Sequence, residues 1–216
     1  MTAHPRRKAE LPEEKSKALL LAAAKKLFAR EGFQGTTVRD IAQEAGVNLS
    51  LVSYYFQGKE GLYRACLEQF GQARLEAVER MIQPVESTAE LRLRLKMAVE
   101  EILRIQIAEP EIAQIVHREI EQNLPVAQEI FEKTFLKIFQ AWVRFFADAK
   151  AKGFLRPEVD PVILAQVIQG SLNYFVRVDA IRARYFNHSI RDEVHRDQLI
   201  ENFVTVFLCG SLKPTA

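Results

Sequence analysis

Residues 35–56 constrain the fold more than any other stretch, because GTTVRDIAQEAGVNLSLVSYYF predicts two short helices joined by a tight turn. Thr37, followed three residues later by Asp40, is typical of a capping box at a helix start. Gly46 lies where a residue with positive φ ends that helix, and Asn48 can cap the next one. This pattern predicts a helix-turn-helix, whose second helix enters a DNA major groove. A helical hairpin that does not bind DNA has a similar pattern.

A further helix, from Ser16 to Gly32, is predicted before this pair. Its apolar residues recur on one face at positions 20, 23, 24, 27 and 28, and the glycine ends it. The three helices can share one small core, so we expect a helix-turn-helix domain over residues 16–60. Residues 1–15 predict a flexible basic arm, which either contacts DNA or is a solvated tail.

The remainder of the chain, residues 61–216, also predicts helices and has no repeat, Gly-rich phosphate loop or alternating strand pattern. A linker helix that begins at Lys59 joins it to the first domain. The helices predicted beyond residue 58 span 59–83, 87–108, 111–122, 125–152, 161–185 and 192–212. We therefore expect an all-α protein of about nine to ten helices, with an N-terminal three-helix DNA-binding domain and a C-terminal helical domain.

Charge is distributed unevenly between the two parts. Residues 1–65 carry 11 Lys and Arg against 7 Asp and Glu, whereas residues 66–216 carry 19 against 21. This distribution favours a DNA-binding head on a body with another task. No apolar run reaches the ~20 residues of a membrane span and no secretory signal is visible, so a cytoplasmic protein is expected. Cys66 and Cys209 are expected to be reduced core residues, with a disulfide or redox switch as the alternative.

The motifs of residues 16–67 occur in a specific order: LFAREGF, then GTTVRDIAQEAGV, then a short helix ending in YYF, then GKEGLY. In this order and spacing they resemble the tetracycline-repressor-like (TetR) family of transcriptional regulators. The C-terminal two-thirds resemble that family only in helix content and order. The resemblance implies a homodimer, a palindromic double-stranded DNA operator, and a small-molecule effector bound in the C-terminal domain. A repressor is favoured, because occluding a promoter needs no contact with polymerase.

The predicted DNA contacts lie at the start of the first short helix, on the second one, and at the start of the linker helix. Arg39 is the best candidate for reading a guanine edge, since a bidentate contact gives about 1–3 kcal/mol of discrimination; an exposed arginine in ion pairs is the alternative. Many family members carry Tyr where this chain has Ser53, which indicates altered specificity and leaves Tyr54 as the stronger phosphate donor. The predicted set is Thr37, Arg39, Asn48, Leu49, Ser50, Ser53, Tyr54, Tyr55 and Lys59.

The C-terminal domain is expected to hold an effector pocket and a dimer surface. Aromatic residues at helical spacing are mostly core, but a subset that lines a cavity with a few polar groups suits a small ligand. The candidate effector residues are His117, Arg118, Phe135, Trp142, Gln169 and Asn173. Two helices from each subunit are expected to form a four-helix bundle through Ile163, Val167, Gly170, Tyr174, Leu199, Phe203, Val206 and Phe207.

No cofactor, metal or catalytic residue is expected from the sequence. His117 and Glu121 lie four apart on a helix, but two ligands do not make a metal site. Two rival classes are a helical ligand-binding protein without DNA binding and an enzyme on a helical scaffold. The first would have lost the helix-turn-helix pattern, which is intact here. The second would have a cluster of polar catalytic residues, which the sequence does not indicate. In the regulator interpretation, a ligand moves the linker helix, 59–83, and changes the spacing of two DNA-binding heads.

Overall fold

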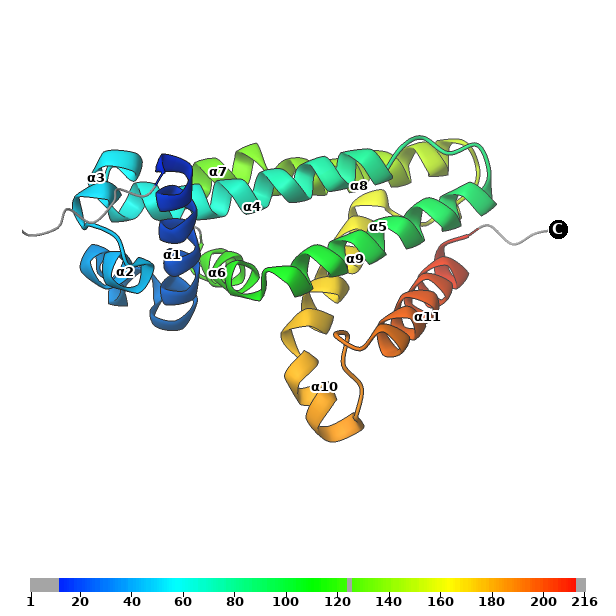
Figure 1. The fold of residues 1–216 in the computed structure, drawn as a ribbon. Coiled ribbons are helices and arrows are strands. Elements are labelled where there is room, and N and C mark those ends of the chain that lie inside the picture. Colours follow the sequence, from blue (N-terminus) through cyan, green and yellow to red (C-terminus); the bar gives the residue numbers. More distant parts are fainter. Residues whose placement is uncertain (1–11, 124–125, 213–216) are drawn as a thin grey trace, which may run out of the picture.

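The computed structural model describes residues 12–123 and 126–212, and these form an all-α protein (Figure 1). The described part contains eleven helices and one isolated β-bridge, between Leu155 and Leu212. The expected fold class is therefore confirmed. In chain order, the helices are α1 Glu13–Gly35, α2 Val38–Ala45, α3 Ser50–Phe56, α4 Lys59–Met81, α5 Thr88–Ala108, α6 Pro110–Glu121, α7 Gln128–Lys133, α8 Phe135–Ala151, α9 Pro161–Arg177, α10 Asp179–Phe186 and α11 Glu193–Ser211.

Helices α1, α2 and α3 form the N-terminal domain around a small apolar core, in which Leu20, Phe28, Ile41 and Val52 are all buried. Helix α1 leaves helical geometry at Gly32, with φ 76° and ψ 174°, and then continues for a short turn. Only glycine adopts this conformation without strain, which agrees with the predicted end of the helix. The helix begins at residue 13, so residues 13–15 do not belong to the expected arm; residues 1–11 of that arm lie outside the described residues.

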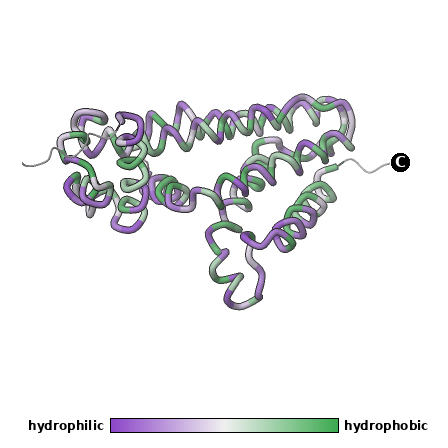
Figure 2. Tube along the Cα trace, viewed as in Figure 1, coloured by the Kyte–Doolittle hydropathy of each residue, from purple (hydrophilic) through white to green (hydrophobic). Residues whose placement is uncertain are grey.

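Helix α4 leads out of the N-terminal domain and runs along the whole body (Figure 1). Helix α5 returns beside it, α8 contacts α4, and α9 packs against α8 and α5. Apolar and polar residues alternate along these helices (Figure 2), so each has an apolar face to bury. Helix α10 extends away from the body and has no buried residue.

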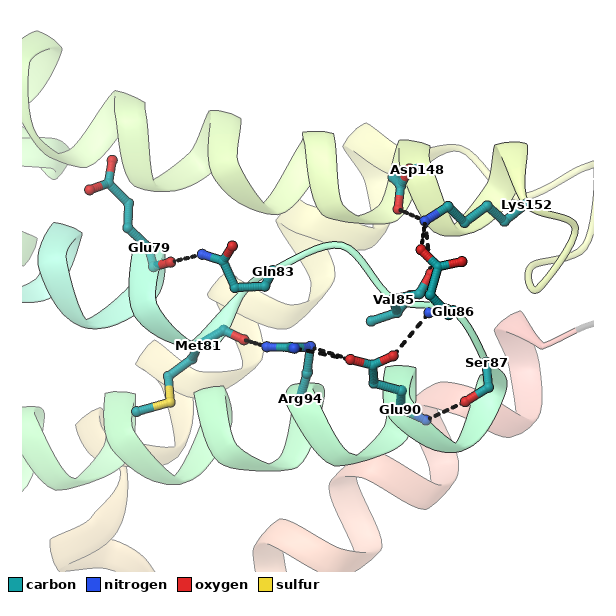
Figure 3. A network of polar contacts seen from close by, with 10 residues as sticks. All are labelled: Glu79, Met81, Gln83, Val85, Glu86, Ser87, Glu90, Arg94, Asp148 and Lys152. Atoms are coloured by element: carbon teal, nitrogen blue, oxygen red, sulfur yellow. Dashed lines mark hydrogen bonds and ion pairs between the residues drawn. The ribbon is translucent and has the colours of Figure 1, made fainter.

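The connection from α4 to α5 lies at the end of the body far from the N-terminal domain and is held by a polar network (Figure 3). Arg94 of α5 donates to the Glu90 carboxylate at 3.0 Å and to the Met81 carbonyl, the last residue of α4, at 3.5 Å. Lys152, after α8, donates to the Val85 carbonyl at 2.9 Å. These contacts fix the C-terminal end of α4 to α5 and α8.

Two of the predicted helices are each divided in the structure, which brings the number to eleven. Thr134, with φ −126° and ψ −70°, separates α7 from α8 within the predicted helix 125–152. It is buried against Gly71 of α4, where an added Cβ would lie 2.5 Å from the Thr134 hydroxyl. This close approach of two helices is a tertiary effect that periodicity does not indicate. The predicted helix over 161–185 is likewise divided, at Val178.

Candidate DNA-binding surface and effector cavity

The start of α2 has the predicted capping box. Thr37 Oγ1 accepts the Asp40 N–H at 3.2 Å, and the Asp40 carboxylate accepts the Thr37 N–H at 3.2 Å and its hydroxyl at 2.6 Å. Because this hydroxyl is already donating, the groups that remain to meet a phosphate are the backbone N–H groups of the first turn. Helix α2 ends at Gly46 in the left-handed conformation, with φ 67°, as the sequence predicts.

The exposed side chains around α2 and α3 form one candidate DNA-reading surface. Arg39 is exposed and has no hydrogen-bond or ion-pair partner among the described residues, so its guanidinium is available for a base edge. Ser53 and Leu49 are exposed on α3 and at its start, and Tyr54 is 76% exposed. These four residues present donors and one apolar group outward from the helix-turn-helix.

The other predicted DNA contacts are already engaged within the domain. Asn48 Oδ1 accepts both the backbone N–H and the hydroxyl of Ser50, each at 2.9 Å, which caps α3 and leaves the Asn48 amide to donate. Tyr55 packs against the core. The Lys59 ammonium donates to the carbonyls of Phe33 and Thr36, at 2.9 and 3.1 Å. It therefore ties the end of α1 to the start of α4 and has one remaining donor.

A cavity of about 680 Å³ lies in the body between α4, α5, α6, α7, α8 and α9. Five of the six candidate effector residues line it: His117, Arg118, Phe135, Gln169 and Asn173. Trp142 does not, because it is only 1% exposed and stacks on Phe146 at a ring distance of 5.7 Å. Its position on α8 points it into the core, and periodicity alone cannot separate a core aromatic from a cavity aromatic.

Helix α6 connects this cavity to the N-terminal domain. Arg118 lines the cavity and donates to the carbonyls of Phe28 and Ala29 on α1, at 3.0 and 2.8 Å. These carbonyls lie in the last turn before the break at Gly32, where helix carbonyls lack partners and attract cations. A second link joins α6 to α4, because the Glu119 carboxylate accepts the Tyr63 hydroxyl at 2.6 Å in a buried site.

The rim of the cavity carries a small ion cluster. Glu121 accepts from Arg177 of α9 at 3.0 Å and lies 3.2 Å from His117 Nε2. Arg177 also contacts the same ring nitrogen. Because the Arg177 guanidinium lies beside both His117 and Glu121, these two residues form part of a contact between α6 and α9. Among the described residues, no group of three potential metal ligands occurs.

Two buried polar residues of this cavity are absent from the predicted set: Arg74 on α4 and Gln106 on α5. They are 6% and 3% exposed, and Arg74 Nε and Gln106 Nε2 have no hydrogen-bond partner. Arg74 follows Phe70 by four residues and precedes Val78 by four, so it stands on the apolar face of its helix. A charged residue on the apolar face of a helix is the sequence feature that could have identified Arg74 as a cavity residue.

Comparison with known proteins agrees with this geometry. Residues 20–66 match the family model of bacterial regulatory proteins, tetR family. The match covers the N-terminal domain of the chain, which is therefore similar to this family. The chain is 32% identical over 128 residues to YttP of Bacillus subtilis (strain 168), a probable HTH-type transcriptional regulator, covering 58% of this chain and 61% of YttP. It is 27% identical over 201 residues to the HTH-type transcriptional regulator RutR of Escherichia coli (strain K12), covering 90% of this chain and 89% of RutR.

The fold of this chain is also found in a solved structure. The ketosteroid transcriptional regulator KstR2 of Mycobacterium tuberculosis superposes with a TM-score of 0.72 at 20% identity, covering 92% of this chain and 95% of that one. These findings support a transcriptional regulator with an N-terminal DNA-binding domain. No helix in the described ranges is long and apolar enough to cross a membrane.

The residues predicted for the dimer surface divide into those exposed on the described chain and those at least partly buried in it. Five are exposed on the isolated subunit, namely Ile163, Val167, Gly170 and Tyr174 on α9 and Val206 on α11. Leu199 and Phe207 are instead buried in the core of the subunit, and Phe203 is half-buried against Phe175 at a ring distance of 6.0 Å. Helix α11 is apolar on more than one face, so the sequence could not indicate which face is internal.

Proposed function

We propose that this protein is a homodimeric transcriptional repressor whose operator affinity is changed by a small molecule bound in the cavity. One observation carries the proposal: Arg118 lines the cavity and also hydrogen-bonds two carbonyls of α1 in the DNA-binding domain. A ligand that displaces α6 or competes for this guanidinium therefore alters the position of α1. Repression follows as the simpler outcome, since a dimer on a promoter blocks polymerase by occupancy alone.

The coupling has more than one contact between the cavity and the DNA-binding domain. Lys25 of α1 forms an ion pair with Glu109, which immediately precedes α6. Tyr63 joins α4 to Glu119 of α6. A shift of α6 thus acts on both α1 and α4. The effector changes operator affinity only if it binds one arrangement of these helices more tightly than the other.

The exposed apolar face of α9 and α11 supports a two-fold dimer. Ile163, Val167 and Tyr174 recur at helical spacing along α9 and are exposed, and Val206 of α11 is 74% exposed. A Cβ added at Gly170 would contact nothing within 4 Å, so this small residue leaves room for a close helix approach. Pairing these helices with their copies makes a four-helix bundle, and the same axis relates two recognition helices. Half-sites about 34–36 Å apart would then be bound together.

The test begins with selection of a duplex from a random pool by the full-length protein, followed by measurement of its Kd at fixed salt. Arg39→Ala should lower the affinity and relax the preference at a guanine position, at about 1–3 kcal/mol per lost bidentate contact. Glu44→Ala, at the exposed end of α2, is the matched control and should change affinity little. Failure to select any duplex would contradict the DNA-binding proposal and favour one of the two rival classes. An unchanged preference in Arg39→Ala would reject only the assignment of that residue.

A further inference from the structure

Arg74 is a buried cation without a counter-charge. Its side chain lines the cavity and is 6% exposed, its Nε has no hydrogen-bond partner, and no carboxylate among the described residues forms an ion pair with it. Burial lowers its pKa to about 10, so it still carries a proton at neutral pH. Buried charges in folded proteins are normally paired and hydrogen-bonded, because desolvating a lone charge is costly. A buried arginine without a counter-charge indicates that a bound ligand supplies the negative charge.

Gln106 places a second donor in the same cavity. It belongs to α5, is 3% exposed, and its Nε2 has no hydrogen-bond partner. Arg74 and Gln106 therefore offer N–H groups from two neighbouring helices, and neither has an acceptor. Among the described residues, the only carboxylate lining the cavity is that of Glu121, which is already paired with Arg177 at the rim. An acceptor that bears negative charge would satisfy both donors.

The surroundings of these donors specify the rest of the ligand. The Arg74 guanidinium lies over the rings of Phe70 and Phe135, with its central carbon 5.5 and 6.0 Å from their centroids. Contacts with ring faces leave the in-plane N–H groups for a planar acceptor. Further apolar lining comes from Val116, Phe131 and Phe139.

The other described arginines that line the cavity are already engaged. Arg118 donates to the Phe28 and Ala29 carbonyls, and Arg177 pairs with Glu121. Among the described lining arginines, Arg74 is therefore the one whose donors await an acceptor. One guanidinium and one amide suit a planar carboxylate, whereas a phosphate dianion would need more donors.

We propose that the cavity binds an organic carboxylate with an apolar body, whose carboxylate is held by Arg74 and Gln106. This inference rests on the proposed function in taking the cavity as the effector site, but it concerns only which chemical class that site selects. Because Arg74 belongs to α4, the anion binds directly to the helix that continues from the DNA-binding domain.

The test compares ligands that differ only in the head group, using isothermal titration and thermal shift on the full-length protein. Decanoate and 4-phenylbutyrate should bind saturably and raise Tm, while 1-decanol, decanamide and decyl phosphate should bind at least 10-fold more weakly. Arg74→Met should weaken binding of the better acid by about 30-fold or more, as expected for loss of one partner of a buried charge pair. Arg80→Met, on the same helix but exposed, should leave Kd within about 2-fold.

A second variant keeps the inference testable if Arg74→Met folds poorly. Gln106→Leu should weaken acid binding by about 10-fold, as expected for loss of a hydrogen bond to a charged group. Unliganded Arg74→Met should have an unchanged or higher Tm, because it removes an unpaired buried charge. Equal affinity for acid and alcohol, tighter binding of the phosphate, absence of acid binding, or wild-type acid affinity in Arg74→Met would each overturn the assignment. These measurements use no DNA, so their failure is distinguishable from failure of the regulator proposal.

Discussion

Replacing Arg118 with methionine tests the contact between the cavity and the DNA-binding domain. Methionine keeps an unbranched apolar stem and removes the hydrogen bonds to the Phe28 and Ala29 carbonyls, of 3.0 and 2.8 Å. A hydrogen bond from a charged donor contributes ~1.5–3 kcal/mol in a buried site, and Arg118 is half-buried, so the two together contribute about 2–4 kcal/mol. Chains of this length lose about 2–4 °C of Tm per kcal/mol. We therefore expect Tm to fall by about 5–10 °C.

The part of the protein that loses stability in Arg118→Met is as informative as the size of the fall in Tm. Hydrogen exchange followed by mass spectrometry should show faster exchange in peptides covering α1 and α6, with little change in α5. Arg104→Met is the matched control, because this exposed arginine bonds only to Glu101 on its own helix. Its Tm should change by less than about 2 °C, as expected for a surface ion pair.

The response of operator binding to a ligand decides whether Arg118 also carries the regulatory signal. A ligand that works through Arg118 changes operator affinity in the wild type by a coupling of about 1–3 kcal/mol, or roughly 5–150-fold. In Arg118→Met, the ratio of the operator Kd with ligand to that without ligand should approach one. The Kd for the ligand itself should change by a smaller factor. If the variant keeps the full ratio, Arg118 stabilises the docking of α1 on α6 but does not transmit the effect of the ligand.

Three other predictions concern the dimer surface, the cysteines and pH. Val206→Glu should convert the proposed dimer to a monomer in light scattering after size exclusion, since in that dimer like charges would meet across the interface of α9 and α11. Burial raises the pKa of the Cys66 thiol to about 12, so a thiol reagent at pH 8 should label it only on unfolding. Cys209 is exposed, contrary to expectation, and lies one turn from Val206, so Val206→Glu should speed its labelling. Burial and a carboxylate partner raise the pKa of Tyr63 above its usual 10.0, so the free energy of unfolding should decrease as pH rises beyond 10, and less so in Tyr63→Phe.

Local signals explain what could be predicted from the sequence. The capping box of Thr37 and Asp40, the left-handed Gly46, and the break at Gly32 each depend on a few neighbouring residues, and the structure has all three. Asp192 likewise caps α11 by accepting the His195 N–H at 3.0 Å. Helix starts and ends of this kind follow from backbone hydrogen bonding within one turn, so they do not depend on the rest of the fold.

Tertiary packing explains what could not be predicted. The break at Thr134 depends on its contact with Gly71, more than sixty residues away in the chain. Helix periodicity identified apolar faces on α8 and α11, but not which of those faces meets the core, a cavity or a partner. Trp142 and Phe207 were misplaced for this reason. Arg74 was not predicted, because apolar residues at helical spacing around it indicate a core face and periodicity does not show that a cavity opens there.

The position of the cavity along α4 gives a small ligand-induced shift mechanical leverage. The network around Arg94 and Lys152 fixes the end of α4 at Met81, whereas its start at Lys59 moves with the DNA-binding domain. At 1.5 Å per residue, Arg74 lies about 10 Å and Lys59 about 33 Å from that fixed end. A rotation that displaces Arg74 by about 1 Å therefore displaces Lys59 by about 3 Å. In a two-fold dimer, opposite shifts of this size change the separation of the heads by about 6 Å, against a half-site spacing of about 34–36 Å. A ligand held near Lys59 would lack this amplification, so in the proposed mechanism an anion site close to the fixed end of α4 gives the largest change in operator spacing for a given local displacement.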